Sequence, residues 1–144
     1  MVFTNKYSES LIIKFPNFAL SKSLAEAYEW YEVNGELNAC ALFTGLTHYV
    51  AYELIKNNKN ITQEERDIYL FIENVREKFH NYEDPSPEFN FDNAICTCFL
   101  ENLLNIASHN SISYARFIPY LGEKSKEYCR AWDEFTGVKS PGLW

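Results

Sequence analysis

The residues with the clearest metal-binding spacing are Glu77 and His80, which form a Glu-x-x-His motif. Di-iron carboxylate proteins carry two such motifs and two further glutamates inside a helical bundle, because two cations need several carboxylates and imidazoles. This chain has one copy, close to the predicted end of a helix. We therefore expect no di-iron centre.

The other histidines and the cysteines do not indicate a zinc site either. His48, His80 and His109 have no helical spacing to one another, and the sequence contains neither His-Glu-x-x-His nor Cys-x-x-Cys. Zinc needs three or four ligands that converge on one point. Cys96 and Cys98 are two residues apart on a predicted helix, which directs their sulfurs about 200° apart. The sequence predicts neither a metal nor a cofactor.

The sequence contains no familiar catalytic motif. The segment Gly122-Glu123-Lys124-Ser125 is similar to the end of a phosphate-binding loop, but the earlier glycine and the preceding strand are missing. The G-x-S-x-G sequence that exposes a nucleophilic serine is also missing. We expect the protein not to be an enzyme. The alternative is a small helical enzyme built around Glu77, His80 and Glu101.

The charge of the chain indicates what kind of partner it binds. The 144 residues carry a formal net charge of −7, and residues 23–55 contain five acids and no Lys or Arg. A negative field repels nucleic acid and anionic membranes and attracts basic proteins. No apolar run approaches the roughly 20 residues of a membrane span. We expect a basic protein partner, and neither nucleic-acid nor membrane binding.

Two acidic stretches are the candidate binding surface. Four glutamates from Glu26 to Glu36 recur every three or four residues and so follow one face of a predicted helix. Four more acids lie in the proline-containing connection 81–90 and just after it, which we expect to be exposed. An aromatic side chain beside carboxylates is a common composition of binding hot spots. The alternative is an ordinary solvated face. The predicted partner-binding residues are Glu26, Glu29, Trp30, Glu32, Glu36, Glu83, Asp84, Glu88 and Asp92.

The four cysteines, Cys40, Cys96, Cys98 and Cys129, lack the usual paired spacing. The first residues also lack the apolar stretch and cleavage site of a signal peptide. We therefore expect a cytoplasmic protein in which all four cysteines are reduced thiols in the core.

Apolar residues recur with helical spacing almost throughout. The expected helices cover about residues 7–15, 23–33, 36–57, 62–79, 91–108 and 114–120, followed by a last helix with the apolar stripe Leu121, Tyr128, Trp132 and Phe135. Capping boxes are predicted at Ser23 and Thr62, and Pro16 is expected to end the first helix. The helix over 36–57 is apolar on nearly every side, so we expect it to be central.

A short phrase occurs twice, as Phe71-Ile72-Glu73-Asn74-Val75 and as Phe99-Leu100-Glu101-Asn102-Leu103, 28 residues apart. Two similar helices at a fixed offset are typical of stacked helical repeats. The alternative is that two amphipathic helices share an apolar stripe by chance.

The chain as a whole resembles a family of small all-helical bacterial proteins of uncharacterised function. The resemblance lies in Phe15-Pro16, Phe71-Ile72-Glu73, the segment 99–103 and the segment 117–122. These motifs pack helices, and the resemblance implies no catalytic residues. In size, charge and architecture the chain also resembles the immunity proteins of bacterial toxin systems.

These observations predict a single all-α domain over residues 1–144, with about seven helices in a bundle or a short α-solenoid. We expect it to bind another protein without catalysis, most concretely as an immunity protein that neutralises a basic, nuclease-type toxin domain. It would be a monomer alone and would form a one-to-one complex with the toxin. A helical scaffold that binds peptides is the alternative binding function.

Overall fold

The computed structural model describes residues 6–79 and 92–144. Within these ranges the chain is helical and forms no strand, which confirms the predicted all-α, single-domain fold. In chain order the elements are α1 (Lys6–Lys14), α2 (Pro16–Ala19), α3 (Lys22–Tyr31), α4 (Ala39–His48), η1 (Tyr49–Ile55), α5 (Gln63–Phe79), η2 (Ile95–Glu101), α7 (Asn102–His109), η3 (Tyr114–Arg116), η4 (Ile118–Tyr120) and α8 (Glu123–Thr136).

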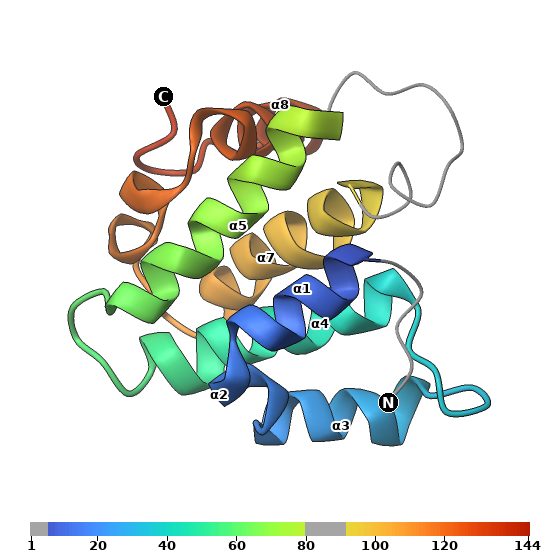
Figure 1. Cartoon of the computed structure of the whole chain (residues 1–144). Helices are drawn as coiled ribbons and strands as arrows, with labels where there is room; N and C mark the ends of the chain where they lie inside the picture. The colour runs from blue at the N-terminus through green and yellow to red at the C-terminus, as the bar shows by residue number, and fades with distance from the viewer. Residues whose placement is uncertain (1–5, 80–91) are drawn as a thin grey trace.

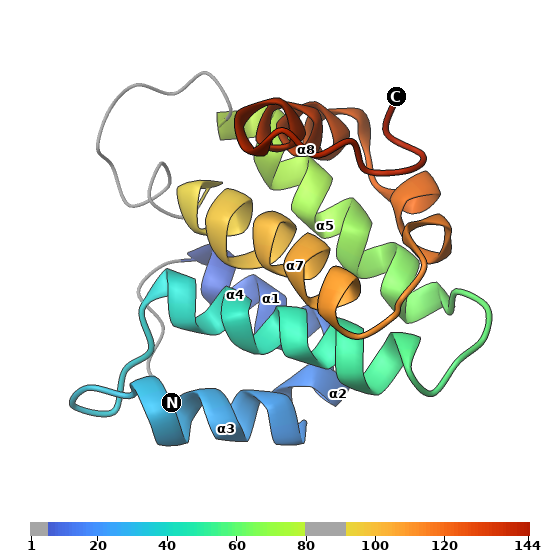
Figure 2. The same ribbon diagram turned by 180° about the vertical axis from the view of Figure 1, so that it is seen from behind.

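The helix formed by α4 and η1 lies in the middle of the molecule (Figures 1 and 2). It packs against α3 on one side and against η2 and α7 on the other, while α5 and α8 pack together further out. This arrangement confirms the central position predicted for the helix over 36–57. The helix begins at Ala39, later than predicted, because the Asn38 side chain accepts a hydrogen bond from the Ala41 N–H at 2.8 Å and caps it.

The contact between α4 and η2 contains a buried polar link. Both η1 and η2 are π-helical, and a π-turn disturbs the regular pairing of backbone carbonyls. The Cys98 carbonyl accepts hydrogen bonds from the Thr47 hydroxyl (2.8 Å) and the Asn102 amide (3.3 Å). Thr47 is fully buried, so this link satisfies polar groups inside the core.

The helix starts agree in part with the sequence. The helix α3 is capped by Ser21, whose hydroxyl accepts from the Leu24 N–H at 3.1 Å, so the capping box predicted at Ser23 is wrong. The Ser23 hydroxyl instead donates to Glu53 on the central helix at 2.5 Å. At α5 the predicted cap is present, since the Thr62 hydroxyl accepts from the backbone N–H three residues later at 3.2 Å.

The two copies of the repeated phrase both hold α8. Glu73 is buried and accepts from the N–H groups of Lys124 (2.7 Å) and Ser125 (2.9 Å), which caps the first turn of α8. A Cβ at position 122 would collide with the Glu73 side chain, so a larger residue than glycine would displace this cap. Glu101 in the second copy accepts a hydrogen bond from the Tyr128 hydroxyl in the middle of α8.

The prediction for Phe135 is wrong. Its side chain is 82% exposed and stacks against Trp132 on the surface of α8, with ring centroids 5.8 Å apart. The predicted stripe of α5 is correct where it is described, since Ile68, Phe71, Ile72 and Val75 are buried.

The cysteines correct a second prediction. Cys40 and Cys98 form a disulfide across 58 residues, and Cys40 is exposed rather than in the core. Cys96 and Cys129 are buried free thiols, and burial raises the pKa of each to about 12. The packing of α4 on η2 brings the disulfide partners together, which spacing along the chain does not reveal.

We expect the disulfide to be present in the purified protein and to stabilise it. Alkylation of the unfolded protein without reductant should label only Cys96 and Cys129. The double variant Cys40→Ser/Cys98→Ser should lower the free energy of unfolding by roughly 2–4 kcal/mol, because the crosslink restricts the unfolded chain. Labelling of all four cysteines before reduction would contradict the bond.

The second copy of the repeated phrase provides a test of the core. Phe99 is fully buried, so Phe99→Ala should lower the free energy of unfolding by roughly 3–5 kcal/mol in urea denaturation. Phe135→Ala removes the same atoms from the surface and should change it by less than about 0.5 kcal/mol. Equal losses in the two variants would contradict this placement of the two rings.

Candidate functional site

The outer face of α3 carries three of the predicted partner-binding residues. Glu29 and Trp30 follow Glu26 by three and four residues, so both are neighbours of Glu26 on one face of the helix. All three are exposed, and the Trp30 side chain is 76% exposed. The opposite face of α3 packs closely on α4, where Gly45 leaves room for Ala27. This close packing fixes which face of α3 points outward.

A tight turn after α3 holds the next two glutamates. Asn34 and Gly35 both have positive φ, at 54° and 80°, as the two central residues of a type I′ turn require. Val33 and Glu36 exchange backbone hydrogen bonds across it at 3.0 and 3.1 Å. The Glu32 carboxylate accepts from the Gly35 N–H, so the turn is fixed by its own side chain as well.

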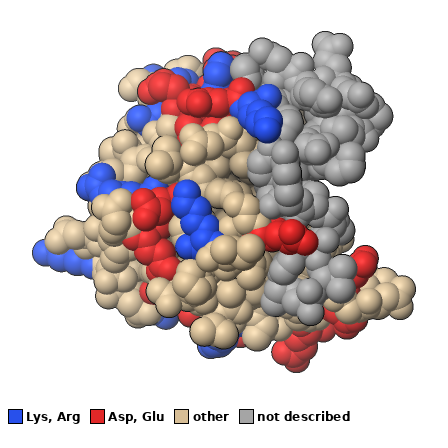
Figure 3. Space-filling view, viewed as in Figure 1, with Lys and Arg blue, Asp and Glu red and all other residues tan. Residues whose placement is uncertain are grey.

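Helix α3 and this turn together form one surface, which we call the acidic aromatic face. It consists of Glu26, Glu29, Trp30, Tyr31, Glu32, Val33 and Glu36, all of them exposed. Figure 3 shows acidic side chains gathered along the lower edge of the molecule over these elements. The ion pairs found among the described side chains do not include these four carboxylates.

The acidic aromatic face borders a small pocket of about 190 Å³ between α3 and α4. Glu26, Trp30 and Tyr31 line it from α3, and Thr44 and His48 line it from α4. Burial lowers the pKa of His48 below its usual value, although the nearby Glu26 carboxylate acts in the opposite direction. The imidazole is therefore neutral at pH 7, and the pocket combines an aromatic wall with one carboxylate. Such a pocket is chemically suited to a cationic side chain.

The remaining predicted residues do not join this surface. Glu83, Asp84 and Glu88 lie outside the described residues. Asp92 was predicted among the exposed acids, and this is wrong because it is 6% exposed and pairs with the buried Arg76 at 2.8 Å. The pair joins α5 to the segment before η2, and removing either partner would leave an unpaired charge in the interior.

Sequence reasoning did not identify Thr44 and His48. They come from the central helix, and only the packing of α3 on α4 places them beside Trp30. Their one signal in the sequence is that they are polar residues of a mostly apolar helix, and the buried Thr47 shares this signal.

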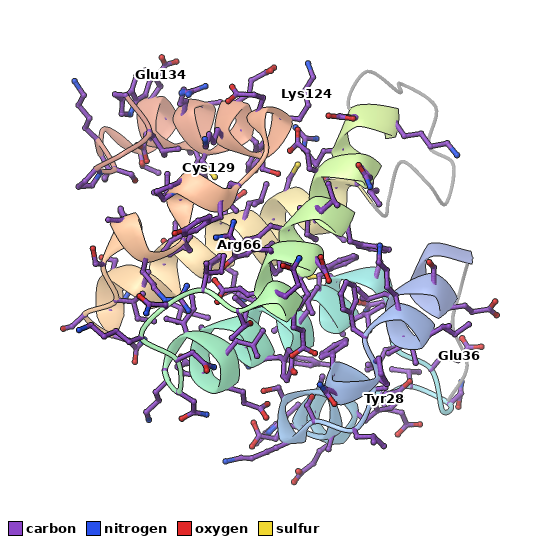
Figure 4. The ribbon with its side chains drawn as sticks, turned by 60° about the vertical axis from the view of Figure 1, so that its left-hand side comes forward. Tyr28, Glu36, Arg66, Lys124, Cys129 and Glu134 are labelled. Atoms are coloured by element: carbon purple, nitrogen blue, oxygen red, sulfur yellow. A yellow bond between two sulfur atoms is a disulfide. The ribbon has the colours of Figure 1, made fainter. Side chains whose placement is uncertain are left out.

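Figure 4 shows that Tyr28 and Glu36 lie at the end of the molecule opposite Lys124 and Glu134, which mark α8. Charged residues of α8 are therefore available as controls that are remote from the acidic aromatic face.

In the described part of the chain, no group of three or more His, Cys, Asp or Glu residues is arranged to hold a metal ion. No helix there combines the length and the apolar character needed to cross a bilayer. Comparison with family models, curated proteins and solved structures gave no match.

Proposed function

We propose that this protein binds another protein without catalysis and that the acidic aromatic face is its docking surface. The observation that carries the proposal is Trp30, a large aromatic side chain that is 76% exposed beside four carboxylates that belong to none of the ion pairs found among the described side chains. Exposing so much apolar surface is unfavourable in the free protein, and tryptophan is among the residues enriched in binding hot spots. The ordered helix and turn support the proposal, because a preformed surface loses little conformational entropy on binding.

The proposed partner is a basic protein domain. Its lysines and arginines would meet Glu26, Glu29, Glu32 and Glu36, and one of them would enter the pocket beside Trp30. There the cation would lie against the indole ring and the Glu26 carboxylate, a combination worth on the order of 1–2 kcal/mol when water is excluded. Opposite fields would also accelerate encounter of the two proteins.

The most concrete form of this proposal is an immunity protein that neutralises a cognate bacterial toxin of the nuclease type. A nuclease must present cations to the phosphates of its substrate, so its substrate surface is basic. An acidic domain that covers this surface competes with the nucleic acid for the same cations. One acidic aromatic face per chain fits a one-to-one complex.

The immunity proposal also concerns the cellular compartment in which the protein would meet its toxin. The sequence predicts the cytoplasm, whereas a structural disulfide such as Cys40–Cys98 is typical of oxidising compartments. An immunity protein in an oxidising compartment would meet its toxin before the toxin reaches the cytoplasm. The test of the disulfide described above therefore also bears on where neutralisation takes place.

Two sequence-based alternatives are less well supported. The enzyme alternative required Glu77, His80 and Glu101 to converge, but Glu77 is exposed, Glu101 is engaged by the Tyr128 hydroxyl, and His80 lies outside the described residues. The peptide-binding scaffold has no separate support among the described residues, because the only feature that would favour it there is the acidic aromatic face itself.

The immunity proposal predicts a toxin gene beside this one, and the test is a calorimetric titration against the purified toxin domain that such a gene encodes. Glu29→Gln/Glu32→Gln should weaken binding at least tenfold, about 1.4 kcal/mol, because it removes two charges from the face. The matched control Glu77→Gln/Glu134→Gln removes two exposed charges elsewhere and should change affinity less than threefold. Trp30→Ala should cost about 2 kcal/mol or more, as expected for a hot spot.

All three variants should keep the parent's melting temperature within a few degrees, since every replaced side chain is exposed. Stopped-flow measurements should show that added salt slows association more than it speeds dissociation. Unchanged affinity for both the Trp30 and the glutamate variants would exclude the acidic aromatic face as the docking surface.

A further inference from the structure

A second concave site lies at the C-terminal end of the central helix formed by α4 and η1. It is a cavity of about 410 Å³ between the end of η1, the loop 56–60 and the segment 110–116. This loop and segment are next to each other at the left of Figure 1. A volume of this size is within the range of small-molecule sites in proteins.

The charge of this cavity is opposite to that of the protein. Lys56, Lys59 and Arg116 line it, and none of the residues described around it is Asp or Glu. Neither lysine belongs to an ion pair found among residues 6–79 and 92–144. In Figure 3 basic side chains project at the left edge, where the loop after η1 lies. A pair of uncompensated cations at a concavity, in a chain of net charge −7, produces a local field that attracts anions.

Arg116 fixes the shape of the cavity. Its guanidinium donates two hydrogen bonds to the fully buried Glu65 carboxylate, at 2.8 and 2.9 Å, and further ones to the Asn58 and Asn60 carbonyls at 3.2 and 3.3 Å. These bonds tie the loop 56–60 to η3 and to α5. The charge of Arg116 is offset by Glu65, so the two lysines supply the net positive charge.

The rest of the lining combines hydroxyl groups with an apolar wall. Ser111 and Ser113 line the cavity from the segment after α7. Ser111 has a positive φ of 57°, and the Ile112 N–H bonds back to the Ala107 carbonyl at 3.1 Å, which turns the chain sharply at this point. Ile55 and Ile112 form the apolar part together with the ring of Tyr52, which is 40% exposed.

We propose that this cavity binds a small organic phosphate. Its phosphate group lies between the Lys56 and Lys59 ammonium groups with Ser111 as a hydroxyl donor, and its apolar or aromatic part lies against Ile55, Ile112 and Tyr52. A phosphate monoester carries close to two negative charges at neutral pH, which matches two uncompensated lysines, whereas a carboxylate would offset only one. This assignment does not rest on the function proposed for the acidic aromatic face.

The probe for this site is phenyl phosphate, which joins a dianion to one aromatic ring. In calorimetric titration phenyl phosphate should bind more tightly than inorganic phosphate and more tightly than benzoate, and phenol should not bind. Amide resonances of the loop 56–60 and the segment 110–116 should shift on titration. Absence of phenyl phosphate binding, or benzoate binding as tightly as phenyl phosphate, would overturn the assignment.

Matched variants separate this site from general attraction to the protein. Lys56→Gln/Lys59→Gln should weaken phenyl phosphate binding at least tenfold. The control Lys22→Gln/Lys139→Gln removes two exposed lysines that do not line the cavity and should change binding less than twofold. Circular dichroism should be the same for both variants, because all four side chains are exposed. Equal weakening by the two variants, or none by the first, would show that the cavity is not the binding site.

Discussion

The buried carboxylate of Glu65 places the strongest constraint on this structure. It is fully inaccessible to water and accepts hydrogen bonds from both arms of the Arg116 guanidinium and from the Tyr69 hydroxyl at 2.5 Å. Removing a carboxylate from water costs several kcal/mol unless it is paired and hydrogen-bonded. Arg116 must therefore be held against α5. This contact fixes the position of η3, which contains Arg116, and of the loop 56–60, whose carbonyls accept hydrogen bonds from the same guanidinium.

Two turns further along α5, Glu73 acts in a similar way on a different neighbour. Its carboxylate caps the N-terminus of α8, while Asp133 near the other end of α8 accepts bonds from Ser140 and the Trp144 indole. Glu73 thus joins α8 to α5, and Asp133 holds the last residues of the chain against α8. Among the acids of α3 and its turn, Glu32 fixes the turn, whereas Glu26, Glu29 and Glu36 belong to none of the ion pairs found among the described side chains.

The sequence predicted the features that depend on neighbouring residues. The stripe of α5, its cap at Thr62 and the end of the first helix before Pro16 all follow from local spacing and backbone preferences. The central position of α4 and η1 also followed, because a helix that is apolar on nearly all sides needs neighbours on nearly all sides.

The features that were missed depend on contacts between distant segments. Ser23 was predicted as a cap, but Glu53 lies beside it and Ser21 is free to cap α3 instead. Asp92 was counted with the surface acids because nothing along the chain shows that Arg76 is adjacent to it. Nothing along the chain shows either that Cys40 lies next to Cys98 or that His48 lies beside Trp30. In the candidate site, the sequence identified the residues of α3 but not which face of α3 would be exposed, since the packing of Ala27 on Gly45 decides that.

The two proposed sites are physically connected through the central helix. His48 lines the pocket beside Trp30, Tyr52 lines the cationic cavity, and their rings are in contact with centroids 5.5 Å apart. One helical turn, about 6 Å, separates His48 from Tyr52. The phosphate would lie further away, between Lys56 and Lys59, and Lys56 is eight residues after His48, about 12 Å along a helix and more than the Debye length of about 8 Å at physiological salt. A phosphate bound in the cavity would therefore act only weakly on a cation in the pocket at physiological salt, and more strongly at low salt. With both sites occupied, the anion would favour the cationic partner, and by reciprocity the partner would favour the anion to the same degree. The sign of this coupling follows from the charges alone, and its size depends on how much of the Tyr52 and His48 contact is shielded from water when the partner covers α3.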